Sequence, residues 1–314
     1  MNTPTTVFPE SPPGSQAALP AATSTRPFYW SVRRELWENR SITIAPLIVA
    51  GVVLFASLIS TIGLPRRVRA AAALEDPAKL HAAIVRPLSV APAPIMFVTF
   101  LVGIFYSLDA LHGERRDRSI LFWKSLPVSD RTTVLSKAII PLGVLPLIGF
   151  VLGLAAERIV LLLSAAVLLA SGMSPAELWA QFRFFQEPLV MLYGLTVHVL
   201  WFAPIYAWLL LVSAWARRMP VLWAALPPFA IGLVEKIAFN TSHVCSLLQY
   251  RVTGAMTEAF AVSSQPGADH PNIDRLTQLD PARFLTTPGL WIGLALAAAC
   301  LAVAVRLRRN KEPI

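Results

Sequence analysis

The feature that most constrains this chain is a series of long apolar runs separated by short charged segments. A helix needs about 20 residues to cross a hydrocarbon core of roughly 30 Å, and most of the runs reach that length. β-Barrel membrane proteins carry short alternating segments instead. Only 14% of the residues are charged, against about a quarter in soluble domains. We therefore predict an all-α integral membrane protein with about six transmembrane helices, at residues 42–64, 87–108, 138–172, 188–216, 220–234 and 287–305.

The third run, 138–172, is longer than one span requires. Its only charges are Glu157 and Arg158, and residues 155–171 contain no Gly, Pro, Asn or Asp that would favour a turn. As a single helix the run extends about 52 Å, at 1.5 Å per residue. The composition favours one long helix over a hairpin, with the charged pair at or beyond the outer headgroups. The sequence assigns no role to that pair.

The distribution of basic residues predicts the sidedness. Six spans put both termini on one side, and that side holds most of the 27 lysines and arginines. The positive-inside rule then places both termini in the cytoplasm of a bacterium, with the spans in its inner membrane. Arg66, Arg67 and Arg69 conflict with this assignment, because they directly follow the first span on the outer side. The net charge of +9 is not gathered into a basic stripe, so nucleic acid is not expected as a partner.

Two segments precede the first span. Residues 1–27 are rich in Pro, Ser, Thr and Ala, which predicts a disordered cytoplasmic tail rather than a signal peptide. Residues 28–40 predict a short amphipathic helix that lies in the membrane plane and leads into the six-span domain, 41–314. A charged helix start that projects into solvent is the alternative. The candidate interfacial residues are Phe28, Trp30, Arg33, Arg34, Leu36 and Trp37.

The polar segment between the second and third spans carries the most chemical information. Gly113 ends the second span, and residues 114–126 predict a short helix dense in charge that Pro127 stops. Ile120 and Trp123 are three residues apart, which suits contact with another surface. The segment is typical either of a docking helix for a soluble partner or of a solvated loop that sets topology.

The run Glu114-Arg-Arg-Asp-Arg-Ser-Ile-Leu-Phe-Trp-Lys-Ser-Leu-Pro-Val-Ser129 resembles the cytoplasmic signature of type-2 ABC exporter permeases. In that family an acidic-basic cluster, a small residue, an aliphatic pair and a Ser/Thr-Leu-Pro-Val-Ser-like ending follow the second span. The preceding run Tyr106-Ser-Leu-Asp-Ala-Leu-His-Gly113 is similar to the end of that span, and 28–40 is similar to the family's interfacial elbow helix. The resemblance extends from about residue 28 to the C-terminus. The length of 138–172 departs from the family pattern.

The resemblance implies a permease subunit that pairs with a second copy or a paralogue and with two cytoplasmic ABC ATPases. Closure of the ATPases would push on a coupling helix, and membrane lipid would surround the spans. ATP and magnesium are expected in the partner, because no phosphate-binding loop occurs here and no lysine follows a glycine. We therefore expect no cofactor, no catalytic residue and no enzyme activity in this chain. The implied docking residues are Glu114, Arg115, Arg116, Arg118 and Trp123.

Other polar residues leave alternatives open. His198 lies within the fourth span, where it lines a transport pathway or, more simply, makes a hydrogen bond between helices. Cys245 and Cys300 lack metal-ligand spacing, so no metal site is expected. A scaffold or secondary transporter without ATPase coupling is the first alternative function. A membrane enzyme is the second, with chemistry in the outer connection 235–286 from His243, Asp269, His270, Asp274 and Asp280.

Overall fold

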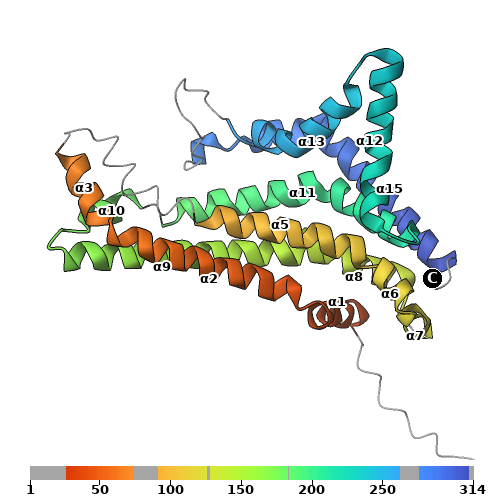
Figure 1. The fold of residues 1–314 in the computed structure, drawn as a ribbon, viewed down its shortest axis with the longest axis horizontal. Coiled ribbons are helices and arrows are strands. Elements are labelled where there is room, and N and C mark those ends of the chain that lie inside the picture. Colours follow the sequence, from red (N-terminus) through yellow and green to blue (C-terminus); the bar gives the residue numbers. More distant parts are fainter. Residues whose placement is uncertain (1–25, 74–90, 126–127, 183, 262–275, 311–314) are drawn as a thin grey trace, which may run out of the picture.

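The computed structural model describes residues 26–73, 91–125, 128–182, 184–261 and 276–310. Across these ranges the chain is helical, and its β structure is one isolated bridge between Phe260 and Leu279. Six of the described helical stretches are long and apolar enough to span a membrane, which confirms the predicted helical fold with about six candidate spans (Figure 1). The predicted tail lies, up to residue 25, outside the described residues. The six stretches are Ser41–Ile62, Pro92–Arg116, Asp130–Ala170, Gln186–Trp215, Pro220–Phe239 and Pro288–Asn310.

The body of the bundle is built from helices that lie side by side (Figure 1). Ala50, Ile95 and Ala156 form a buried cluster where three of these helices meet. A Cβ added to Gly149 would stand 3.0 Å from Thr99 Oγ1, closer than side chains usually pack, so glycine favours this close approach. The helices of the body are α2 (Ser41–Ile62), α5 (Pro92–Asp109), α9 (Leu145–Ala170), α11 (Gln186–Trp215) and α15 (Pro288–Asn310), the last of which packs along α11.

The third stretch is one continuous helical segment, Asp130–Ala170, where the apolar run was 138–172. It begins earlier than the apolar run because its first turns, α8 (Asp130–Ile139), are polar. α8 joins α9 through a π-helical turn, η1 (Ile140–Val144). Pro141 lies in this turn and has no backbone N–H to donate, so the hydrogen-bond ladder shifts there without ending the helix.

The C-terminal part of α9 extends past the start of α11 and is covered by two short helices (Figure 1). These are α3 (Leu64–Ala72) and α10 (Ala176–Gln181). They pack on α9 through a buried apolar cluster that includes Val68, Val160 and Leu178. The cluster explains how so long a helix remains ordered beyond its neighbours.

Glu157 and Arg158 lie where this extension begins. The Arg158 guanidinium is centred 4.4 Å from the ring of Phe182, and its Nη1 is 3.7 Å from Glu187 Oε2 at the start of α11. Glu157 is buried next to Glu187. The charged pair therefore joins α9 to the N-terminus of α11, a role that the sequence did not assign.

Two of the arginines that conflict with the positive-inside rule have structural partners. Arg67 donates to the Ser60 carbonyl near the end of α2, and Arg69 Nη2 donates to the Ser171 carbonyl at 3.1 Å, just past α9. Basic side chains at helix C-termini satisfy free carbonyl groups and oppose the negative end of the helix dipole. These contacts hold both arginines at helix ends. Their presence on this side of the first span therefore has a structural reason in addition to any effect on membrane topology.

α12 (Pro220–Phe239) leaves the bundle and has no buried residue within the chain (Figure 1). Pro228 lacks an N–H group, so the Ala224 carbonyl has no donor one turn later in its own helix. Trp208 of α11 supplies one, because its Nε1–H donates to that carbonyl at 3.1 Å. A proline inside the helix thus creates the polar contact that attaches α12 to the bundle.

The connection 235–286 is largely helical where it is described. Glu235 accepts the backbone N–H groups of His243 at 2.6 Å and Val244 at 2.8 Å. This carboxylate caps the next helix and fixes the turn that precedes it. The elements of the connection are α13 (His243–Ala259), η2 (Leu276–Gln278) and α14 (Pro281–Thr286).

Candidate functional site

The candidate site is the end of the bundle where α1 (Pro27–Glu38), α6 (His112–Arg116), the start of α8 and the end of α15 converge (Figure 1). Pro27 opens α1 at the position where a helix tolerates proline best. Ser129 opens α8, because its hydroxyl accepts the Thr132 N–H at 3.1 Å. We call this region the charged end, and define it by Arg34, Glu35, Glu114, Asp130, Lys137 and Arg308.

Glu35 is the centre of the first group of contacts, and its side chain is fully buried. Glu35 Oε1 is 2.8 Å from Lys137 Nζ and 2.7 Å from Arg34 Nη2, and Oε2 accepts a hydrogen bond from the Tyr106 hydroxyl at 2.8 Å. Burial would by itself raise the pKa of this carboxyl, but Lys137 and Arg34 outweigh burial and hold the pKa below its usual value. Glu35 is therefore ionised at neutral pH and joins α1 to α5 and α8.

Glu114 is the centre of the second group. Glu114 Oε1 is 3.1 Å from Lys137 Nζ and 3.2 Å from Arg34 Nη2, and Oε2 is 3.2 Å from Arg308 Nη2. Arg308 also pairs with Asp130 at the start of α8. One carboxylate thereby ties α6 to α1, α8 and α15.

The charged end contains as many acidic as basic side chains, and both Lys137 and Arg34 contact two carboxylates. Buried charges are tolerated when they are paired in this way, and removing one partner of a buried pair costs about 3–5 kcal/mol. Any movement that separates one of the four helices from the others would leave a buried charge unpaired. The network therefore favours movement of this end as a unit.

A further set of contacts fixes α6 to the end of α11. Ser213 Oγ accepts two consecutive backbone N–H groups where α6 begins, at 3.0 and 2.9 Å. Arg115 Nη1 donates to the carbonyl oxygens of Ala214 at 2.9 Å and Ala216 at 3.2 Å. A cation at these carbonyls opposes the dipole of α11. Arg115, like Glu114, thus makes its contacts inside the chain.

The docking residues predicted from the sequence fall into different environments. Glu114 and Arg115 are buried in the contacts described above. Arg116 and Arg118 are exposed, the first at the end of α6 and the second between α6 and α7 (Ser119–Ser125). Arg118 has a φ of 58°, in the left-handed region, and this conformation turns the chain from α6 into α7.

α7 exposes a different pair of apolar residues from the pair that the sequence singled out. Ile120 is buried, and Trp123 is half-buried under the Arg34 guanidinium, which lies 3.8 Å from the centre of its ring. Leu121 and Phe122 are instead 59% and 60% exposed. Together with the two exposed arginines they form what we call the α7 surface.

α1 exposes the aromatic residues proposed to meet the membrane. Phe28, Trp30 and Trp37 are exposed, and Leu36 is half-buried against the bundle. Arg33 lies over the rings of Trp30 at 5.2 Å and Trp37 at 4.6 Å. Exposed tryptophans with basic neighbours favour the headgroup region of a bilayer.

His198, the candidate pathway residue, lies in an aromatic cluster between α11 and α5. Its Nε2 is 3.4 Å from the Tyr206 hydroxyl, and its ring centre is 4.8 Å from that of Phe202. Phe100 of α5 meets the imidazole edge-on at 5.9 Å. The hydrogen bond to Tyr206 stays within α11, so His198 meets α5 through ring packing on Phe100 and not through the hydrogen bond between helices that the sequence suggested.

The acidic and histidine residues of the connection 235–286 show no shared site within the described part of the chain. Asp280 caps α14, because its Oδ1 accepts the Arg283 N–H at 2.9 Å, and His243 begins α13. No group of three or more His, Cys, Asp or Glu side chains suited to a metal ion is found among the described residues. Asp269, His270 and Asp274 lie outside those residues.

No family model matches the chain, and no curated protein or solved structure matches it. Its function is therefore inferred from the charged end, the α7 surface and the sequence around them.

Four members of the charged end were not singled out from the sequence. Each is a charge beside a span or on an amphipathic helix, where charges commonly set topology. One signal was present: Glu35 falls close to the apolar face that Phe28 and Val32 define on α1. The four residues are Glu35, Asp130, Lys137 and Arg308.

Proposed function

We propose that the chain is the membrane-spanning permease subunit of an ATP-driven ABC exporter. The observation that carries this proposal is the α7 surface, in which two exposed apolar side chains of α7 adjoin two exposed arginines just before it, between the second and third spans. The resemblance to type-2 ABC exporter permeases puts the coupling helix at the same place in the chain. The α7 surface is held by the charged end, so a force on it would reach α1, α8 and α15 together.

The proposed partner is a separate cytoplasmic ATPase that binds ATP and magnesium. Leu121 and Phe122 would enter an apolar depression on that protein, and Arg116 and Arg118 would meet acidic side chains at its rim. Charge pairs at such a rim set register and partner choice more than affinity. Glu114 and Arg115 would act from within the chain by holding α6, and Trp123 by supporting Arg34.

The proposed mechanism is alternating exposure of a pathway formed with a second copy or a paralogue. The nucleotide states of the ATPase would contact the α7 surface differently, which is the condition for any ligand to shift a conformational equilibrium. In this arrangement α1, α7 and both termini lie in the cytoplasm, and the spans lie in a bacterial inner membrane. The exposed tryptophans of α1 would contact lipid headgroups.

The proposal is tested by affinity purification of the tagged full chain from native membranes in mild detergent, followed by mass spectrometry. Arg116→Glu and Phe122→Asp change the α7 surface, and Arg306→Glu is a matched control because Arg306 is an exposed arginine of α15. We expect an ABC ATPase to co-purify with the wild type and the control, and to fall about tenfold with either α7 variant, equivalent to 1.4 kcal/mol. Absence of any nucleotide-binding protein, even after crosslinking, would favour a scaffold or secondary transporter.

A further inference from the structure

Arg33 lies on the face of α1 that points away from the bundle, between two tryptophans. Trp30 precedes it by three residues and Trp37 follows it by four, so the three side chains are neighbours on one side of the helix. The Arg33 guanidinium is 5.2 Å from the ring centre of Trp30 and 4.6 Å from that of Trp37. Both rings are more than half exposed, at 56% and 66%. We call these three residues the α1 clamp, because two indole rings hold one cation.

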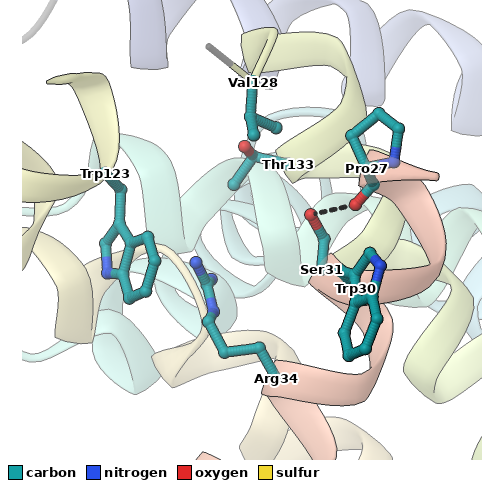
Figure 2. A pocket seen from close by; sticks show the side chains of 7 residues that line it. All are labelled: Pro27, Trp30, Ser31, Arg34, Trp123, Val128 and Thr133. Carbon is teal, nitrogen blue, oxygen red and sulfur yellow. Dashed lines mark hydrogen bonds between the residues drawn. The ribbon is translucent and has the colours of Figure 1, made fainter. Parts of the chain in front are cut away.

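The neighbouring arginine has a different environment. Figure 2 shows Arg34 reaching from α1 toward Trp123. Its Nη2 pairs with Glu35 at 2.7 Å and with Glu114 at 3.2 Å. By contrast, no hydrogen bond or ion pair joins Arg33 to any residue that the structure describes. A guanidinium carries five N–H donors, and contact with an aromatic ring gives them no oxygen acceptor. The donors of Arg33 are therefore available to a ligand from outside the chain.

The charge on this face of α1 is positive. Arg26, just before the helix, and Arg40, just after it, are exposed and add two cations to that of the clamp. The acidic residues of α1 lie elsewhere, since Glu35 is buried in the charged end and the Glu38 carboxylate is 3.6 Å from Arg34. Charge complementarity therefore favours an anionic ligand.

The position of α1 in the chain identifies the kind of anion. α1 ends at Glu38, and α2, which is long and apolar enough to span a membrane, begins at Ser41. Tryptophans directly before an apolar span favour the headgroup region of a bilayer. The phosphate of a phospholipid is the anion present there, and its oxygens accept paired N–H groups from a guanidinium. The exposed indole rings add apolar surface that a lipid contacts and a small soluble anion does not.

We propose that the α1 clamp binds the phosphate of a phospholipid with net negative charge, with the Arg33 guanidinium donating to the phosphate oxygens. Trp30 and Trp37 hold the guanidinium in place and pack against the glycerol and the first carbons of the acyl chains. Arg26 and Arg40 attract further anionic headgroups to the same face. The inference rests on the membrane location within the proposed function and not on any ATPase.

The experiment is native mass spectrometry of the purified full chain in mild detergent, titrated with phosphatidylglycerol or with phosphatidylcholine of the same acyl chains. The first lipid is anionic and the second is zwitterionic. Arg33→Gln removes the cation of the clamp, and Trp37→Ala removes one ring but no charge. Arg306→Gln is the matched control, because Arg306 is an exposed arginine of α15, the helix that ends at the charged end. The intensities of the lipid adducts give an apparent Kd for each chain and lipid.

We expect the wild type to bind phosphatidylglycerol more tightly than phosphatidylcholine. Arg33→Gln should weaken phosphatidylglycerol binding about fivefold, which is the attraction of one basic residue for anionic lipid. Trp37→Ala should weaken it about threefold, as the loss of one cation–π contact predicts. The control should change it less than about twofold, because its charge lies outside the clamp. Equal affinities of the wild type for the two lipids, equal losses in Arg33→Gln and Arg306→Gln, or a Trp37→Ala chain that binds like the wild type would overturn the proposal.

The lipid titration and the affinity purification fail independently. An ATPase recovered by a chain that does not distinguish the two lipids would reject only the lipid site. A lipid preference that depends on Arg33 and Trp37, in a chain that recovers no ATPase, would support the lipid site and reject only the permease proposal.

Discussion

Replacement of Glu35 with glutamine is the sharpest test of the charged end. The change nearly preserves the size of the side chain and removes the charge that faces Lys137 at 2.8 Å and Arg34 at 2.7 Å. Lys137 then keeps one carboxylate, Glu114, at 3.1 Å. The Tyr106 hydroxyl keeps an acceptor in the new amide oxygen, so the loss is mainly electrostatic.

The expected loss of unfolding free energy follows from the burial of the charged pair. Breaking a buried pair costs about 3–5 kcal/mol, and the remaining contact with Glu114 puts the Glu35→Gln loss at the lower end, about 3 kcal/mol. In a chain of this size 1 kcal/mol lowers the melting temperature by about 2 °C, so we expect a decrease of roughly 6 °C. Thermal unfolding of the full chain in detergent, followed by tryptophan fluorescence, measures it.

Glu38→Gln is the matched control on the same helix. Glu38 is 49% exposed and its carboxylate is 3.6 Å from Arg34 Nε. Exposed pairs contribute less than about 1 kcal/mol, so the control should lower the melting temperature by less than about 2 °C. If the two glutamine variants unfold at the same temperature, Glu35 does not belong to a buried network and the reasoning is refuted.

Three further predictions rest on single contacts. The pKa of Glu35 is lowered in the folded chain, so its stabilisation is present above the unfolded value of 4.5 and is lost as pH falls through the folded pKa. As pH falls below about 4.5, the melting temperature of the wild type should therefore drop more than that of Glu35→Gln, and parallel curves would contradict the shift. Trp208→Phe removes the donor to the Ala224 carbonyl and should lower the free energy of unfolding by about 1 kcal/mol, measured by denaturant titration. Gly149→Val forces a Cβ against Thr99 and should cost about 1–3 kcal/mol in the same titration, whereas an unchanged midpoint would show that α5 and α9 are less close.

The sequence predicts the class and the number of spans because hydropathy is a property of consecutive residues. The start of the third helical segment was harder to predict, since α8 is polar and its continuity with α9 depends on backbone hydrogen bonds. Pro141 lies at this junction, where a π-helical turn accommodates it. The cap that Glu235 supplies to α13 likewise depends on a turn that hydropathy does not reveal.

The charged end could be predicted only in part, because its contacts join residues distant in the sequence. Glu35 and Lys137 are 102 positions apart, and Glu114 and Arg308 are 194 apart. In the sequence such charges look the same as Arg69, which caps a helix end instead. The sequence indicated a candidate docking segment between two spans, but which of its side chains are exposed depends on the fold.

The most direct test of the permease proposal is photo-crosslinking from the α7 surface in native membranes. A photoreactive amino acid replaces Phe122, and a control chain carries it at the exposed Trp291, near the opposite end of α15. We predict an adduct between the Phe122 probe and an ABC ATPase, altered by ATP and absent from the Trp291 chain. Adducts that contain no nucleotide-binding protein, or that are the same from both positions, would contradict the assignment.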